Sequence, residues 1–214
     1  MTTSIIGVGN LGGTVARHLV AGGELVVLAA LDEAHAQALA DELGPNASAA
    51  SVEDAIAAAD VVVLATWLAQ TRELVPPLAR LFENKVVVDP SNPIGFEDGQ
   101  MIRTLPEGES SGSVVAGLLP ASAHYVKAFG TLGAVEQLAT SANRDPRVVL
   151  FYATDDDVAE AAAQRLIGAA GFAPLKVGGA ADAGRIEGPD GELQGRILDL
   201  DEARAIVASE GVRA

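Results

Sequence analysis

Short runs of apolar, mostly β-branched residues alternate regularly with longer amphipathic stretches along this chain. The apolar runs predict strands, and the amphipathic stretches predict helices. Strands are expected at Ser4–Val8, Leu25–Ala29, Val61–Ala65, Val86–Asp89, Tyr125–Phe129, Val148–Ala153 and Pro174–Val177, with a further short one near Ala47–Ala50. Helices are expected at Leu11–Ala21, Asp32–Leu43, Val52–Ala58, Leu68–Phe82, Gly112–Leu119, Gly133–Ala139 and Asp155–Ala170. Near-continuous apolar strands that alternate with helices predict an α/β fold with a doubly wound, mainly parallel sheet.

A glycine-rich segment, Gly7-Val-Gly-Asn-Leu-Gly12, closes the first predicted strand and opens the first predicted helix. In that position it is a dinucleotide fingerprint, because Gly7 allows a tight turn, Gly9 lets the backbone approach a pyrophosphate, and Gly12 lets the helix pack close to its strand. The helix N-terminus also offers unpaired N–H groups to the phosphates. The alternative is a glycine-rich turn without a ligand. We predict a Rossmann-type fold that binds NADP or NAD.

Several element boundaries carry their own signals. Thr154 and Asp157 are expected to form a capping pair for the helix that follows, and Ser51 is expected to cap Val52–Ala58. The pair Pro76-Pro77 should break or kink the helix that contains it. The stretch Gly95–Ser113 is expected to be the one long polar loop, and its place after a strand end is typical of binding loops.

The last part of the chain differs in character from the rest. Gly178–Gly195 is rich in Gly, Asp and Glu and is expected to be loop-like, and Asp199–Ser209 is expected to form a short helix. This tail is too short for the helical second domain that some dehydrogenases add to their cofactor fold. We therefore expect an NAD(P)-binding domain over residues 1–177 and a C-terminal appendage over 178–214, which packs on that domain or on a dimer partner.

Composition narrows the range of functions. The chain has 214 residues, of which 49% are hydrophobic, and it contains no cysteine, which excludes disulfides, thiolate metal sites and cysteine nucleophiles. The formal net charge of −15 argues against nucleic acid or an anionic membrane surface as a partner. No signal peptide or long apolar run is visible, so we expect a cytoplasmic protein with no membrane partner.

Polar residues gather where the predicted strands end. In an open parallel sheet, ligands bind outside the carboxyl ends of the strands. The glycine loop, Thr66-Trp67, Asp89-Pro-Ser-Asn-Pro93 and Gly130-Thr131 occupy these ends, so we expect them to meet in one crevice. Two alternatives stay open for Trp67: it lines a ribose and nicotinamide site with Thr66, or it packs in the core. Asn92-Pro93 either orients a ring amide or forms a structural turn.

Other reactive residue types form no recognisable site. The histidines at positions 18, 35 and 124 lack ligand spacing and no carboxylate cluster accompanies them, so we predict no metal site. Asp155-Asp-Asp157 is most simply an acidic helix N-terminus. Tyr125-x-Lys127 does not have the spacing of the Tyr-x-x-x-Lys pair of short-chain dehydrogenases, and both residues would lie within a strand.

Five segments together resemble a known family over nearly the whole chain. They are Gly7–Gly12, Val61–Trp67, Val87–Pro93, Val126–Gly133 and Ala183–Glu187. In this order and spacing the chain resembles the NADP oxidoreductases that use the deazaflavin coenzyme F420, together with related dinucleotide-binding proteins and the cofactor domain of the STEAP metalloreductases.

The resemblance implies hydride transfer between nicotinamide C4 and C5 of a deazaflavin, with the two rings stacked. Donor and acceptor are then both cofactors, so no catalytic side chain is expected. The implied pyrophosphate site is formed by Gly9, Asn10 and Leu11. The implied nicotinamide site is formed by Thr66, Trp67, Asn92 and Pro93, and the candidate acceptor-binding residues are Ser91, Gly130 and Thr131. A homodimer is usual for the family.

Two departures from the family pattern leave alternatives open. Members that select NADP carry a Ser-Arg pair where this chain has Ala30 and Leu31, with His35 as a further basic position. Asp32 lies one or two residues late for an NAD-selective acid and is equally suited to cap a helix. Relatives carry Asn or His at Gly130, and its missing side chain is expected to enlarge the site. The acceptor is therefore a deazaflavin, a flavin or another small compound, or the protein binds a dinucleotide without catalysis.

Overall fold

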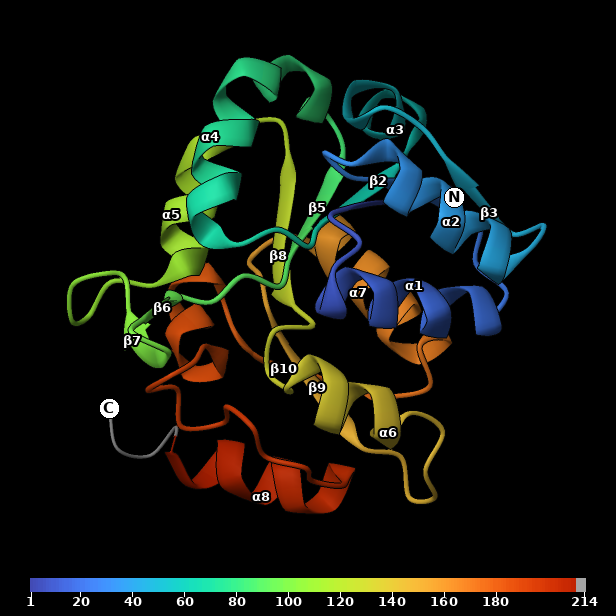
Figure 1. Ribbon diagram of the computed structural model, residues 1–214. Helices are drawn as coiled ribbons and strands as arrows, with labels where there is room; N and C mark the ends of the chain where they lie inside the picture. The colour runs from blue at the N-terminus through green and yellow to red at the C-terminus, as the bar shows by residue number, and fades with distance from the viewer. Residues whose placement is uncertain (211–214) are drawn as a thin grey trace.

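The computed structural model describes residues 1–210 and has a mainly parallel sheet between two layers of helices (Figure 1). The strands of this sheet are β1 (Thr3–Ile6), β2 (Val26–Ala29), β3 (Ala47–Ala49), β4 (Val61–Leu64), β5 (Val86–Asp89), β8 (His124–Ala128), β9 (Val149–Ala153) and β10 (Ala173–Gly178). Their order is β10-β9-β8-β5-β4-β1-β2-β3, and neighbouring strands are parallel except β8 and β9, which are antiparallel. The predicted Rossmann-type α/β fold is thus confirmed, and all eight predicted strands are present.

Helices cover both faces of the sheet. They are α1 (Asn10–Ala21), α2 (Glu33–Leu43), α3 (Val52–Ala58), α4 (Leu68–Leu78), α5 (Ser111–Leu118), α7 (Asp157–Ala169) and α8 (Leu200–Glu210), with a three-residue α6 (Ala139–Ser141). One apolar core joins α1, α2 and α7 to one face of the sheet, and a second joins α3, α4 and α5 to the other. Such two-sided cover explains why the strands are almost entirely apolar.

The order of the strands reverses next to β1. From β1 the chain runs outward through β2 and β3, then returns to pair β4 on the other side of β1. The carboxyl ends of β1 and β4 therefore leave the sheet side by side with helices on opposite faces, and this geometry creates a crevice for ligands.

One of the two predicted helix caps is present in the structure. Ser51 accepts a hydrogen bond from the Asp54 N–H, as predicted for α3. The predicted Thr154–Asp157 capping pair is wrong, because Asp156 is the N-cap of α7 and accepts from the N–H groups of Val158 and Ala159. The buried Thr154 hydroxyl lies two residues earlier, where it donates to the Tyr125 carbonyl oxygen and accepts from the Asp156 N–H at 3.1 Å.

The helix with two prolines ends close to them. α4 continues through Pro76 and Pro77, stops at Leu78, and is followed by a 3-10 turn, η1 (Ala79–Phe82). Each proline lacks the N–H that would bond the carbonyl one turn earlier, which weakens the last turn. The predicted break therefore lies just after Pro77.

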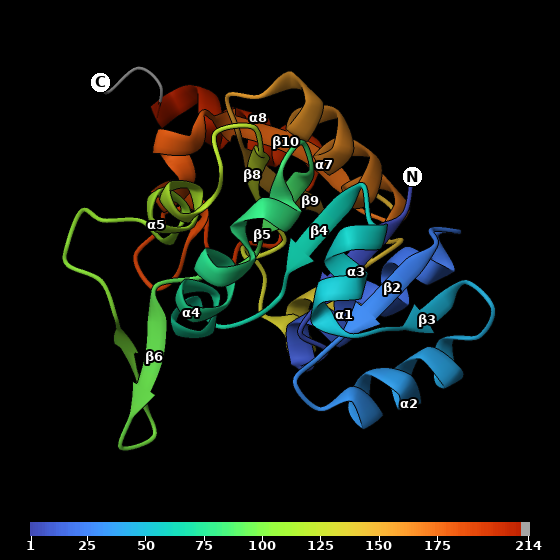
Figure 2. The same ribbon diagram turned by 90° about the horizontal axis from the view of Figure 1, so that it is seen from above.

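The expected loop Gly95–Ser113 is partly regular structure, so that prediction is wrong. Ile94–Glu97 (β6) and Gln100–Arg103 (β7) pair as an antiparallel hairpin, and α5 takes up the last residues of the stretch. Asp98 and Gly99 form the turn, both with positive φ, as a two-residue hairpin turn requires. Figure 2 shows that the hairpin projects away from the rest of the chain.

The tail packs on the edge of the sheet. A 3-10 helix, η3 (Ala180–Ile186), follows β10, and the predicted C-terminal helix is present as α8. A third apolar cluster joins β9 and β10 to Ile186, Leu193 and Ala203. The expected helix at Gly133–Ala139 is a π-helix, η2 (Ala134–Leu138), that leads into α6. Within residues 1–210 no helix combines the length and the apolar character that crossing a membrane requires.

Candidate active site

The glycine loop holds α1 against β1. Gly7 has a φ of +96°, and a Cβ there would lie 2.7 Å from the Ala65 carbonyl oxygen. A Cβ on Gly12 would lie 1.8 Å from the Gly7 carbonyl oxygen, so the helix and the loop touch at this residue. A Cβ on Gly9, in contrast, would meet nothing within 4 Å. The loop is therefore closed at Gly7 and Gly12 and open at Gly9, as the dinucleotide fingerprint requires.

The open side of the loop offers hydrogen-bond donors. Gly9 is the N-cap of α1 and supplies no side-chain cap. Within the described residues the N–H groups of Asn10 and Leu11 have no acceptor. These donors and the positive end of the helix dipole fit a phosphate group.

A cavity of about 580 Å³ brings the four predicted strand ends together. It is lined by Gly9, Asn10, Leu11, Ala65, Thr66, Trp67, Pro90, Ser91, Asn92, Ile94, Met101, Gly130, Leu132, Gly133, Ala134, Val135 and Gln194. The lining thus includes most of the predicted nicotinamide and acceptor residues, together with part of the β6–β7 hairpin. Pro93 and Thr131 are not part of it. We call this space the first cavity.

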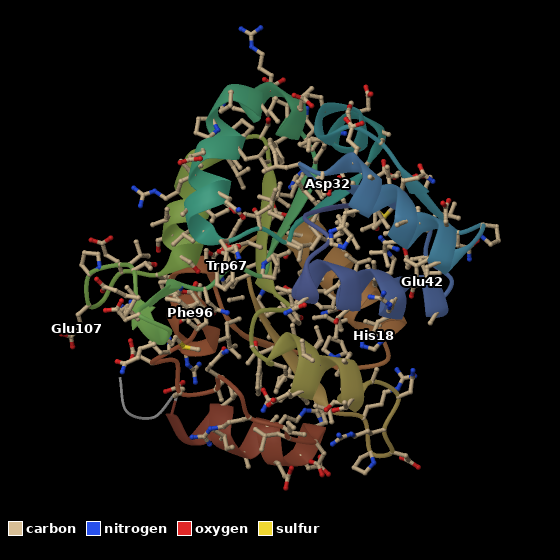
Figure 3. The ribbon with its side chains drawn as sticks, in the orientation of Figure 1. His18, Asp32, Glu42, Trp67, Phe96 and Glu107 are labelled. Atoms are coloured by element: carbon tan, nitrogen blue, oxygen red, sulfur yellow. The ribbon has the colours of Figure 1, made fainter. Side chains whose placement is uncertain are left out.

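Trp67 stands at the rim of the first cavity and is half exposed. Its side chain is 52% accessible, so the alternative that it packs in the core is wrong. Its ring meets the ring of Phe96 edge to face, with centroids 6.0 Å apart (Figure 3). The Thr66 hydroxyl beside it is hydrogen-bonded to Thr71 Oγ1 at 2.8 Å.

Asn92 ties three segments together. Its Nδ2 donates to the Gly130 carbonyl oxygen at 3.0 Å, and its Oδ1 accepts from the Gly188 N–H at 2.8 Å. The amide therefore fixes the ends of β5 and β8 and the segment after η3. A Cβ on Gly130 would lie 2.5 Å from the Pro90 carbonyl oxygen. The interpretation that Gly130 enlarges the site is wrong, because backbone and not ligand space faces its missing side chain.

A second cavity of about 550 Å³ lies on the other side of the glycine loop, toward β2 and α4. It is lined by Ile6, Gly7, Val8, Gly9, Ala30, Leu31, Asp32, His35, Val52, Glu53, Thr66, Gln70, Glu73, Leu74, Pro77 and Leu78. The residues Ala30, Leu31 and His35, predicted from the family pattern, all lie there. Gly9 and Thr66 line both cavities, so the two spaces meet at these residues.

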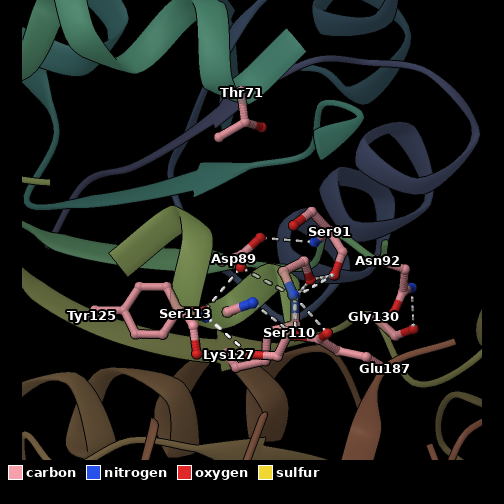
Figure 4. A network of polar contacts seen from close by, with 12 residues as sticks. Thr71, Asp89, Ser91, Asn92, Ser110, Ser113, Tyr125, Lys127, Gly130 and Glu187 are labelled. Carbon is pink, nitrogen blue, oxygen red and sulfur yellow. Dashed lines mark hydrogen bonds and ion pairs between the residues drawn. The ribbon is translucent and has the colours of Figure 1, made fainter. Parts of the chain in front are cut away.

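A buried polar network lies under the first cavity (Figure 4). Lys127 Nζ lies 3.1 Å from Asp89 Oδ2 and 3.2 Å from Glu187 Oε1, and all three side chains are buried. The lysine also donates to Ser111 Oγ at 2.7 Å and to the Ser91 carbonyl oxygen. Since Ser91 lines the first cavity, the network supports the cavity wall from below.

Other polar groups of the network are paired as well. The two Glu187 oxygens accept from the N–H groups of Ser111 and Gly112, at the N-terminus of α5, each at 2.8 Å. The Tyr125 hydroxyl donates to Asp89 Oδ2 at 2.9 Å. Burial, and then the Asp89 charge, raise the pKa of Tyr125 well above its ordinary value, so the phenol keeps its proton.

The sequence reading missed this network as a unit. Its signals were a lysine inside an otherwise apolar strand and an aspartate at the end of the neighbouring one, which the register pairs as Asp89 with Lys127. Among the described residues, no group of three or more His, Asp or Glu side chains is arranged to hold a metal ion.

One protein family matches the first part of the chain. Residues 2–93 match the family described as NADP oxidoreductase, coenzyme F420-dependent. This stretch contains the glycine loop, the strands up to β5, and both Ser91 and Asn92. A search of curated proteins found no match to the chain.

Solved structures share the fold over its whole length. A hypothetical protein from Sinorhizobium meliloti is 30% identical with a TM-score of 0.82, over 93% of this chain and 95% of that chain. A protein from Arthrobacter sp. FB24, named as a candidate F420-dependent NADP reductase, is 21% identical with a TM-score of 0.73, over 99% of this chain and 91% of that chain. The 3-hydroxyisobutyrate dehydrogenase of Mycobacterium tuberculosis is 17% identical with a TM-score of 0.63, over 84% of this chain and 55% of that chain. Over residues 2–93 the chain therefore resembles the coenzyme F420-dependent NADP oxidoreductases, and over 93% of its length it is similar to the Sinorhizobium meliloti protein.

Proposed function

We propose that the chain binds a nicotinamide dinucleotide across the two cavities and transfers hydride between it and a planar ring acceptor, a deazaflavin. In this arrangement the N–H groups of Asn10 and Leu11 hold the pyrophosphate, the second cavity holds the adenosine half, and the first cavity holds the nicotinamide half. The support for this placement is the continuity of the two cavities at Gly9 and Thr66. The open face of Gly9 gives the pyrophosphate room to approach.

The observation that carries the reaction type is the lining of the first cavity. Every residue in that lining belongs to the described part of the chain, and none has an ionisable side chain. Reduction of a carbonyl compound calls for a proton donor beside the substrate. Transfer between two cofactors relies on ring alignment instead, since the nicotinamide supplies hydride at C4, the deazaflavin receives it at C5, and the balancing proton at the deazaflavin N1 comes from water. The composition of the wall therefore favours a ring acceptor over a small carbonyl compound.

The chain's own part is to hold and align the two rings. Trp67, Ile94, Met101 and Val135 line the cavity with apolar side chains, which suit a ring system. Two polar atoms of the lining, Ser91 Oγ and Gln194 Oε1, have no hydrogen-bond partner among the described residues. We assign them to the nicotinamide carboxamide, which offers both an acceptor and a donor.

The test mixes purified protein with NADH or NADPH and oxidised deazaflavin and follows the absorbance of both cofactors. We expect turnover with deazaflavin, and no turnover with small aldehydes or ketones. Turnover with free flavin but not with deazaflavin would show that flavin is the acceptor and overturn the proposed deazaflavin. Binding of dinucleotide without turnover on any acceptor would contradict a catalytic function.

Removal of the Phe96 ring tests acceptor binding independently of dinucleotide binding. Phe96 is 60% exposed, meets the Trp67 ring and is paired with Met101, and both of these residues line the first cavity, so Phe96→Ala should raise the KM for the acceptor and leave dinucleotide affinity unchanged. Val158→Ala is the matched control, because Val158 is also exposed but lies on α7. Equal KM values for the two variants would contradict a binding place for the acceptor ring beside Trp67 and Phe96.

We also propose a homodimer and a C-terminal appendage that serves the site. The support for the appendage is that Glu187 and Gln194, both beyond residue 177, reach the buried network and the first cavity. Light scattering coupled to size exclusion tests the dimer. Removal of residues 178–214 tests the appendage, and we expect the shortened chain to lose dinucleotide binding.

A further inference from the structure

The second cavity has the wrong chemistry for a phosphorylated ribose. Its lining, which lies wholly within the described residues, contains three carboxylates, Asp32, Glu53 and Glu73, and neither lysine nor arginine. Recognition of a 2′-phosphate relies on arginine or lysine, because the group carries close to two negative charges. Here the same group would meet only like charges and the imidazole of His35.

The anion position at the start of α2 is already taken. Asp32 is the N-cap of this helix, and its Oδ1 accepts from the Ala34 N–H at 3.1 Å. A carboxylate thus occupies the helix N-terminus that a phosphate would otherwise use. Figure 3 shows Asp32 at this end of α2. Its second oxygen, Oδ2, has no partner among the described residues and can accept a hydrogen bond from a ribose hydroxyl.

Neither Arg17 nor Arg72, which lies on α4, lines the second cavity. Arg17 lines a third cavity, which shares Val8, Gly9 and His35 with the second, and it forms a two-point ion pair with Glu42, with Nε–Oε1 at 3.0 Å and Nη2–Oε2 at 2.9 Å. Leu31 is 92% exposed, at the position where NADP-selective relatives carry arginine, and brings no donor.

We infer that this chain, although its first part resembles NADP oxidoreductases, selects the cofactor without the 2′-phosphate, NAD(H). Asp32 is the residue that reads the free ribose hydroxyl, and Glu53 and Glu73 add charge repulsion against a phosphate. The inference rests on the proposed placement of the adenosine half in the second cavity. Like charges at a protein surface repel, so the 2′-phosphate should weaken binding by roughly tenfold or more in Kd.

The test measures Kd for NADH and NADPH by quenching of Trp67, the single tryptophan of the chain, and by calorimetry. Two fragments that differ only in the 2′-phosphate, adenosine 5′-monophosphate and adenosine 2′,5′-bisphosphate, probe the adenosine end without the nicotinamide. We expect NADH to bind more tightly than NADPH, the monophosphate more tightly than the bisphosphate, and added salt to narrow both differences, because screening weakens repulsion between exposed charges.

Variants test which residues cause the preference for NADH over NADPH. Leu31→Arg combined with Asp32→Ser should reverse it, since it restores an arginine and keeps a helix cap. Asp41→Asn is the matched control, because it removes one charge from the exposed side of the same helix, outside the cavity. It should leave the NADH to NADPH ratio unchanged.

The outcomes separate this inference from the proposed function. Equal or tighter binding of NADPH by the unaltered protein overturns the NAD(H) preference and leaves the proposed function standing. Failure of both dinucleotides and both fragments to bind overturns the proposed function and this inference together. A ratio that shifts as much in Asp41→Asn as in the double variant overturns the role of Asp32.

Discussion

Gly12 packs so closely against Gly7 that a Cβ on Gly12 would lie 1.8 Å from the Gly7 carbonyl oxygen. The glycine loop and α1 must therefore separate to admit even one methyl group. We expect Gly12→Ala to lower the free energy of unfolding by about 2 kcal/mol or more and to abolish dinucleotide binding. Urea denaturation and Trp67 quenching measure the two effects.

Gly9→Ala is the matched control within the same loop. A Cβ on Gly9 has open space and its φ of −69° suits any residue, so this variant should keep its stability. It should still weaken dinucleotide binding, because the methyl group stands where the pyrophosphate approaches. Similar losses of stability in both variants would contradict the division of roles between the two glycines.

Lys127 forms ion pairs with two buried carboxylates. Lys127→Met would leave Asp89 and Glu187 buried without a cation, and breaking one side of such a pair costs about 3–5 kcal/mol. We expect a loss of that size in the free energy of unfolding, measured by urea denaturation. Addition of Glu187→Gln to the variant should recover part of the loss, since it removes one uncompensated charge.

Lys176→Met serves as the control for loss of a lysine. Lys176 pairs with Glu160 on the surface, where water screens the charges, so the variant should be far closer to the unaltered protein. Equal losses in Lys127→Met and Lys176→Met would show that the buried network adds nothing to stability.

The strands that are buried along their whole length were predictable from the sequence. The strands β1, β4 and β5 are buried along their length, so their apolar runs stand out against the amphipathic helices. The hairpin β6–β7 was missed because its residues are largely exposed and follow no apolar alternation. Its signal was the Asp98-Gly99 turn, which depends on backbone conformation and not on hydrophobicity.

The candidate site was predictable where it depends on strand ends. The carboxyl ends of parallel strands share one edge, so Thr66, Ser91 and Gly130 could be placed together without a structure. The buried network could not, because it needs the register of β5 against β8. It also needs the contact between Ser111 and Glu187, which lie 76 positions apart.

Gly130 is required by the backbone of the neighbouring strand end. Its Cβ would lie 2.5 Å from the Pro90 carbonyl oxygen and 3.4 Å from Asn92 Nδ2. We expect Gly130→Ala to push the ends of β5 and β8 apart, with a loss of about 1–3 kcal/mol in unfolding free energy and weaker dinucleotide binding. Gly133→Ala is the control in the same cavity, because its nearest contact would be Gln137 Oε1 at 3.5 Å. Normal stability of Gly130→Ala together with weakened binding would restore the view that the space beside Gly130 belongs to the ligand.

His18 makes stability depend on pH. Burial lowers the pKa of its imidazole below the ordinary 6.5, and the hydrogen bond from Nε2 to the Leu138 carbonyl oxygen, at 3.1 Å, offsets this only in part. The unfolded chain therefore takes up a proton at a higher pH than the folded one. The contribution of neutral His18 to stability is present above pH 6.5 and is lost as pH falls below that value.

The measurement compares the protein with His18→Gln between pH 7.5 and pH 5.5. Carboxylates titrate equally in both proteins, so the difference between their unfolding free energies isolates the imidazole. We expect that difference to shift against the unaltered protein as pH falls, because its unfolded state alone gains the proton. The ring also packs edge to face on Phe172 at 5.9 Å, a contact that the variant loses at every pH and that adds a constant offset. A difference that stays constant over this range would mean that folding leaves the pKa of His18 unchanged.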